Sequence, residues 1–210
     1  LDTISIEIRC NKAYLPDNMN TNISLVMYGS GTVNTVNTKL DSRVLGMDVP
    51  NSQFPSGIVQ VTLFSETGEP LSERLVFVQG KDLVNLDVNS SKTTYNKRER
   101  VSINVNAKDN GANTEGHFSV AVIDESKVPF DENKETTILT YLLLTSDLRG
   151  YIEQPNYYFA HKTNQTYADL DALMLTQGYR RYTWKQLLSD NNSKFPFEPE
   201  KAIQITGTAK

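Results

Sequence analysis

The chain has 210 residues, a formal net charge of -4 at pH 7 and a mean hydropathy of -0.44, with 22% of its residues charged. Positive and negative residues are interspersed rather than blocked, which argues against a nucleic-acid groove or an anionic membrane patch as the main site. No apolar run approaches the ~20 residues that span a bilayer, and the length suffices for two small domains with real cores.

The two ends of the sequence suggest an expectation about the length of the parent protein. Leu1 does not open a signal peptide, and strand-like patterns begin and end the sequence. We therefore expect a piece of a longer polypeptide.

Cys10 is the single cysteine, so neither an intrachain disulfide nor a thiolate metal cluster can form. Cys10 shares one face of the first expected strand with Ile4, Ile6 and Ile8, which favours a small buried hydrophobic side chain over a reactive thiol.

Residues 1–80 are typical of an all-β module. Alternating apolar residues predict strands at residues 4–8, 23–27, 32–40 and 43–49, with a turn at Gly29–Gly31. The long stretch from Gly57 to Val78 then predicts an antiparallel hairpin around a polar ETGEP turn, with one apolar face and the other face toward solvent. About six strands at this spacing favour a sandwich.

A second β-rich region follows a boundary at residues 79–82. We expect a strand at 83–88 and a second hairpin that joins Val101–Ala107, the clearest period-two run, to Phe118–Val122. The connecting residues Asp109, Asn113 and Glu115 could suggest a calcium loop, but the EF-hand spacing is missing, so a hairpin turn is the preferred interpretation.

Helical spacing appears between residues 135 and 190. The pattern predicts a helix over Glu135–Asp147, an extended segment over Tyr151–Phe159, a helix with Thr166 as its N-cap, and a last short helix from Thr183. Residues 194–201 resemble a linker, and the ITGTAK sequence that follows is typical of the first strand of another module.

Few residues suggest chemistry. His117 and His161 lie in different elements, and the nucleophile-elbow, P-loop, HExxH and dinucleotide-glycine motifs are absent. Asp131, Glu132 and Glu135 precede a helix, where a carboxylate suits the helix dipole.

One aromatic and basic group is a candidate interaction surface. It consists of Tyr179, Arg180, Arg181, Trp184 and Lys185, with Tyr182 inside the run. These residue types are enriched at protein interfaces. The alternative, which we prefer, is internal: Trp184 covers the helical core and the arginines bind helix-end carbonyls or bridge to a sandwich.

Several segments resemble one protein family. VTLFSETGEPLSERLVFV is similar to the closing hairpin of a macroglobulin-type module, the Ig-like sandwich that repeats in alpha-2-macroglobulin, and the segment from Arg100 to Asp124 resembles the next such module. DENKETTILTYLLLTSDLRGYIEQPNYYF and LDALMLTQGYRRYTW resemble segments of large Bacteroidota envelope proteins. In those proteins, macroglobulin-like modules precede a carboxypeptidase-regulatory-like domain and often a TonB-dependent receptor plug-like domain. ITGTAK resembles the opening of that regulatory-like domain.

The resemblance implies a mainly β protein with two tandem Ig-like, macroglobulin-type sandwiches. We expect one sandwich at residues 1–80, a second at 81–200 with a helical elaboration at 135–190, and the first strand of a following module at 201–210. The thioester motif C-G-E-Q of proteinase-trapping macroglobulins is absent, so the resemblance assigns covalent capture of a proteinase to none of the residues.

The expected function is that of a noncatalytic structural and interaction region in a larger protein of the periplasm or outer membrane. It would bind a protein partner, such as a component of TonB-dependent transport, would contact the membrane only through the parent protein, and would need no cofactor. Two alternatives stay open: a proteinase-binding macroglobulin without a thioester, and part of an enzyme whose site is completed by other domains.

Overall fold

The computed structural model describes residues 2–80, 82–124, 126–177 and 184. It is mainly β, with nine strands among the described residues, all paired antiparallel in three sheets. Apart from Trp184, every described residue belongs to one compact unit, Leu1–Tyr179.

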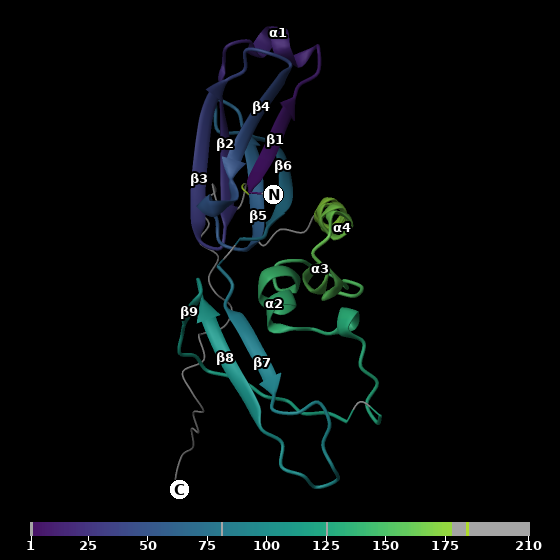
Figure 1. Cartoon of the computed structure of the whole chain (residues 1–210). Helices are drawn as coiled ribbons and strands as arrows, with labels where there is room; N and C mark the ends of the chain where they lie inside the picture. The colour runs from purple at the N-terminus through teal and green to yellow at the C-terminus, as the bar shows by residue number, and fades with distance from the viewer. Residues whose placement is uncertain (1, 81, 125, 178–183, 185–210) are drawn as a thin grey trace, which may run out of the picture. The chain divides into compact units, whose positions relative to one another are not determined.

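The first six strands form two sheets. Their bounds are β1 Thr3–Arg9, β2 Asn22–Gly29, β3 Thr32–Lys39, β4 Val44–Pro50, β5 Gly57–Phe64 and β6 Pro70–Val78. Strands β3, β2, β5 and β6 form the larger sheet in that order, and β1 pairs with β4 in a second layer across it (Figure 1). The six strands predicted for residues 1–80 are thus confirmed, although the Ig-like character of the pair of sheets is not established.

The two sheets share a core because the apolar side chains of their facing surfaces alternate with polar ones. Its buried members are Leu25, Met27, Val49, Phe54, Val59, Val61 and Val78. Side chains of β1 and β4, including Ile4, Ile6, Ile8 and Met47, pack against this cluster. Cys10, the residue after β1, is half-buried.

Turn chemistry fixes the register at the predicted Gly29–Gly31 turn and in the predicted hairpin. Ser30 and Gly31 both have positive φ, at 48° and 82°, and close the two-residue turn between β2 and β3. The ETGEP turn contains Gly68 at φ 80°, and it joins β5 to β6 in the expected antiparallel hairpin.

The back of the β5–β6 hairpin is buried, whereas the sequence predicted that it would meet solvent. Gln60 is 7% exposed and Thr62 is inaccessible, although both point away from the core between the two sheets. The prediction was wrong because alternation along one strand shows which residues share a face and does not show what covers that face.

Helices supply part of this cover. The chain forms η2 Glu132–Lys134, α2 Ile138–Thr140, the π-turn η3 Tyr141–Thr145, α3 Tyr157–Ala160 and α4 Asn164–Thr176. A second core joins Ile58 and Leu75 of the hairpin to Leu144, Leu148, Ile152, Leu170 and Met174. Two further short helices, α1 Tyr14–Asn18 and η1 Asn51–Gln53, lie in the connections between the first six strands.

The predicted helices at 135–147 and after Thr166 are present, but their bounds and the N-cap residue differ from the prediction. The helix predicted at 135–147 is confined to residues 138–145, and the segment predicted as extended contains α3. Thr163, rather than Thr166, caps α4: its hydroxyl accepts a hydrogen bond from Thr166 N, while Thr166 Oγ1 accepts one from Thr163 N. The boundaries at residues 80 and 200 stay predictions, and the last predicted helix and the ITGTAK strand lie outside the described residues, Trp184 excepted.

The third sheet differs from the second predicted sandwich. It contains β7 Asn85–Ser90, β8 Ile103–Asp109 and the two-residue β9 Ala112–Asn113. The predicted hairpin between Val101–Ala107 and Phe118–Val122 is wrong, because β8 pairs along its length with β7 and residues 114–124 adopt no strand. Phe118, Val120 and Val122 are 54%, 73% and 85% exposed, so their alternation reflects no pairing here.

Candidate interaction surface

The predicted aromatic and basic surface falls almost entirely outside the described residues. Tyr179, Arg180, Arg181 and Lys185 are not described, and Trp184 is helical and partly buried. Neither the interface interpretation nor the internal one is therefore tested by the structure.

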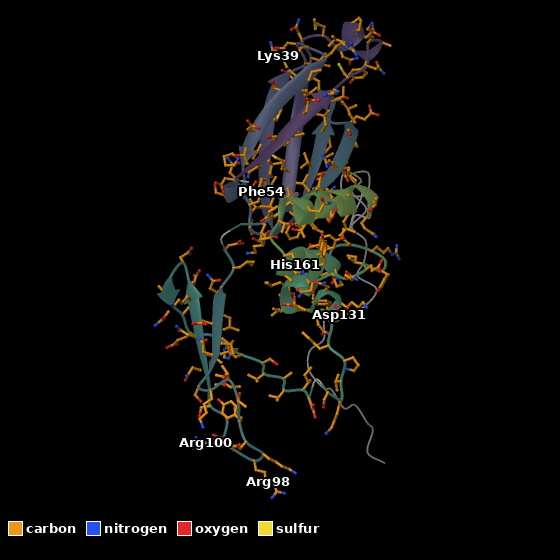
Figure 2. All side chains as sticks on the ribbon, turned by 45° about the vertical axis from the view of Figure 1, so that its right-hand side comes forward. Lys39, Phe54, Arg98, Arg100, Asp131 and His161 are labelled. Atoms are coloured by element: carbon orange, nitrogen blue, oxygen red, sulfur yellow. The ribbon has the colours of Figure 1, made fainter. Side chains whose placement is uncertain are left out.

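The two histidines do not converge. Both histidines are exposed, and the ring of His161 lies near that of Tyr157 with its Nε2 3.0 Å from Asn133 Oδ1. Figure 2 shows His161 and Asp131 in the helical part of the chain. The partner of His161 is an amide rather than a carboxylate, so the ring is oriented for a structural contact.

Two of the carboxylates singled out in the sequence, Asp131 and Asp109, lie at a helix start and beside a turn. Asp131 accepts a hydrogen bond from Asn133 N at the start of η2. Asp109 precedes a two-residue turn in which Asn110 and Gly111 have positive φ, which confirms the hairpin interpretation of the suspected calcium loop. Among the described residues no group of three or more His, Cys, Asp or Glu side chains could hold a metal ion.

Other ionisable groups pair in ways that hold elements together. Arg74 Nη2 contacts both carboxylate oxygens of Asp171 at 2.7 Å, which links β6 to α4. The carboxylate of Asp169 accepts a hydrogen bond from Tyr157 Oη at 2.8 Å and raises the pKa of that phenol. Burial, followed by the charges of Asp169 and Glu153, raises the pKa of Tyr158.

A polar clamp lies where the hairpin ends. Ser56 Oγ donates a hydrogen bond to Asp82 Oδ1, Ser56 N donates to Asp82 Oδ2 at 2.8 Å, and Gly80 N donates to Ser56 Oγ at 2.8 Å. Burial raises the pKa of Asp82, but the hydrogen bonds from Ser56 outweigh it, so the net pKa lies below 3.8. The clamp ties the start of β5 to the chain after β6.

The most unusual surface is one face of the β7–β8 pair. Residues paired across antiparallel strands share a face, so the register of Leu86 with Ala107 and Val88 with Val105 groups these side chains with Ile103. Leu86, Val88, Ile103 and Val105 are 45% to 56% exposed. In Figure 2 the side chains of this sheet project from a single layer of strands.

This apolar face, defined as Leu86, Val88, Ile103, Val105 and Ala107, was not identified as a functional surface from the sequence. Its alternation predicts a strand of the second sandwich, but a strand that faces a partner protein and a strand that faces its own core have the same period. The opposite face carries Asp87 and Asn106, which pair with each other in the register.

Comparisons with known proteins add no relative. The sequence matches none of the protein families, curated proteins or solved structures with which it was compared. Among the described residues, none of the helices combines the length and the apolar character needed to cross a bilayer.

Proposed function

We propose that this chain is a noncatalytic structural and protein-binding region of a larger cell-envelope protein, built from macroglobulin-like β modules and associated with outer-membrane, TonB-dependent uptake or surface assembly. The antiparallel, mainly β fold is compatible with such modules. The family and the location rest on the sequence resemblance, and the partner is a protein component of the envelope.

The exposed apolar face of β7 and β8 is the observation that supports a binding role. Large apolar side chains that remain half-exposed on one face of a sheet favour burial against another protein surface, because covering them removes apolar area from water. The opposite, polar face has no comparable driving force.

Matched variants test this function. In the first, Leu86→Ser and Val105→Ser make the apolar face polar; in the control, Asp87→Ser and Asn106→Ser change the opposite face of the same strands. Each protein is cross-linked in envelope extracts of a Bacteroidota species. We expect the unaltered chain and the control to give the same adduct with an outer-membrane protein and the apolar-face variant to lose it. Equal adducts from both variants, or none from the unaltered chain, would contradict the proposal.

A proteinase-binding role is the second candidate, and one feature favours it. Residues 115–124 and 126–131 are exposed and contain neither helix nor strand, which is typical of segments that proteinases cut. Limited proteolysis should then cleave first in this segment, and small-angle scattering should show compaction. Cleavage without any change in scattering would exclude trapping. Completion of an enzyme site by other domains stays a prediction.

A further inference from the structure

The edges of the first two sheets leave one side of their shared core open. Strand β1 pairs only with β4, and β6 is the last strand of the larger sheet, so each has one edge without a neighbouring strand in the described part of the chain. Residues from both edges line the same cavities, which shows that the two edges border one space.

Three cavities join along this side into a groove, here called the β1–β6 groove. A cavity of about 330 Å³ lies against Thr3–Ser5, a second of about 340 Å³ against Ser5–Arg9, and a third of about 280 Å³ against Ile8–Asn11. The first two share Ser5, Arg74 and Val76, and the last two share Ile8, Leu63 and Ser72. The groove therefore follows β1 from end to end, and α4 borders it beyond Thr3.

The floor of the β1–β6 groove is apolar and incompletely covered. Ile6, Ile8, Leu25, Val61, Leu63 and Val76 line its middle part. Ile4, Ile6 and Ile8 point toward the core and yet remain only half-buried, as do Leu63 and Val76. These side chains occupy every second position, which is the spacing of a strand laid along them.

Backbone groups of β1 also point into the open side. Asn51 N bonds to Asp2 O and Cys10 N bonds to Arg43 O, so the even-numbered residues of β1 form the hydrogen-bonded pairs with β4. The alternation then directs the N–H and C=O groups of Thr3, Ser5, Glu7 and Arg9 away from β4. These are the groups that an added strand would engage.

Charge selects among the extended peptides that could bind there. Four charged residues line the middle of the groove, Glu7, Arg9, Glu73 and Arg74, and with Asp171 at its α4 end the formal charges of the groove sum to only -1. Arg9 pairs with Glu7, and Arg74 pairs with Asp171. Because both guanidinium groups are already neutralised, a strongly acidic or basic peptide gains little, and an uncharged one is favoured.

We propose that the β1–β6 groove binds an extended, uncharged peptide strand of a partner protein, with apolar side chains at alternate positions, by adding it to the free edge of β1. Main-chain hydrogen bonds to Ser5 and Glu7 supply register, and the apolar side chains fill the space above Ile6 and Leu63. The site is separate from the apolar face of β7 and β8.

The test uses a blocked peptide of nine residues in which valine and threonine alternate. Its binding to the whole chain is followed by fluorescence anisotropy, and amide hydrogen exchange is followed for β1. We expect saturable binding and slower exchange at Ser5, Glu7 and Arg9. A peptide of the same composition with its valines grouped together, and one N-methylated at alternate amides, should each bind at least about tenfold more weakly.

Proline substitutions supply matched controls. Glu7→Pro removes an N–H that points into the groove and leaves the β1–β4 ladder intact. Thr35→Pro makes the same change on the outer edge of β3, because the bond from Leu40 N to Thr21 O directs the Thr35 N–H away from β2. Glu7→Pro should weaken peptide binding at least about tenfold, whereas Thr35→Pro and Glu7→Ala should change it less than about twofold.

Specific results would overturn the proposal. They are the absence of saturable binding, equal binding by Glu7→Pro and Thr35→Pro, or amides of Ser5 and Glu7 that are already protected in the free chain. A dimer that Glu7→Pro dissociates would show that a second copy, rather than a partner peptide, occupies the edge. Circular dichroism of each variant identifies loss of folding, and the N-methylated peptide tests the site without any substitution.

Discussion

At the scale of single residues, the clamp formed by Ser56, Gly80 and Asp82 gives a pH-dependent prediction. Asp82 is largely exposed, yet its carboxylate accepts two hydrogen bonds from Ser56. We expect Asp82→Asn to lower the free energy of unfolding by about 1 kcal/mol at pH 7.

The pH dependence follows from the direction of the pKa shift. The folded-state pKa of Asp82 lies below its ordinary value of 3.8, so this stabilisation is present above about pH 3.8 and is lost as pH falls through the folded-state pKa. Urea denaturation at several pH values should show the difference from the unaltered chain shrinking in acid. A difference that stays constant down to the lowest pH, or one equal to that of the exposed Asp41→Asn control, would contradict the assignment.

Two glycines, one in β2 and one in β4, give a second residue-scale prediction. A Cβ atom on Gly29 would lie 2.7 Å from Val59 Cγ2 and 3.0 Å from Ile58 O, whereas a Cβ on Gly46 would meet nothing within 4 Å. Gly29→Ala should therefore destabilise the chain by about 1 to 3 kcal/mol, because Val59 is fully buried and cannot move aside. Gly46→Ala should be neutral or slightly stabilising. Thermal denaturation compares the two, and equal melting temperatures would refute the prediction.

At the scale of elements, α4 is held on the hairpin mainly by apolar burial. Arg74 and Asp171 are 47% and 54% exposed in their side chains, so their ion pair should contribute less than about 1 kcal/mol. Met174 is 2% exposed and lies in the second core. Met174→Ala should cost about 2 to 5 kcal/mol and Arg74→Ala much less. A larger loss from Arg74→Ala in urea denaturation would reverse this ranking.

The predicted hairpins show why sequence alternation identifies strands better than it identifies partners. The β2–β3 and β5–β6 pairs have short turns that contain Gly31 and Gly68, and turn geometry fixes both the partner and the register. Phe118–Val122 also alternates, but only the first residues after the Asn110–Gly111 turn pair with β8, and this pairing extends to the hydrogen bond that Thr114 N donates to Ala107 O. Alternation alone could not show where pairing stops.

The unpaired segment after β9 leads to a direct test. Val120 is 73% exposed, so Val120→Thr should change the free energy of unfolding by less than about 0.5 kcal/mol. The same substitution at the inaccessible Val59 should cost more than 1 kcal/mol, because a hydroxyl would enter the core without a partner. Chemical denaturation measures both. A large loss from Val120→Thr would show that this segment pairs in solution.

At the scale of the whole molecule, the sequence predicted a mainly β chain and the six strands of residues 1–80, because period-two patterns and glycine turns are local signals. It did not reveal that Leu144 and Met174, far along the chain, cover the back of the hairpin, since no local pattern encodes which distant elements meet. The candidate surfaces were missed for a related reason. Whether the side chains of Leu86 and Ile6 are exposed depends on whether a distant part of the chain covers them, and the local sequence does not show this.

The cover of the hairpin by distant helices leads to a prediction about fragments. In a fragment of residues 1–80, Leu75 and Phe77 lose the side chains of Leu144, Phe159 and Leu170, so their apolar surface becomes exposed. The fragment should bind the dye ANS and unfold at lower urea concentration than residues 1–177.

The double substitution Leu75→Thr and Phe77→Thr tests the same surface. It should reduce dye binding by the fragment, because it removes exposed apolar side chains while threonine keeps strand propensity. In residues 1–177 the same change should destabilise by several kcal/mol, because it empties part of the second core. Equal stability of the two fragments, or an equal loss of stability in both from the double substitution, would show that the helices do not complete the hairpin.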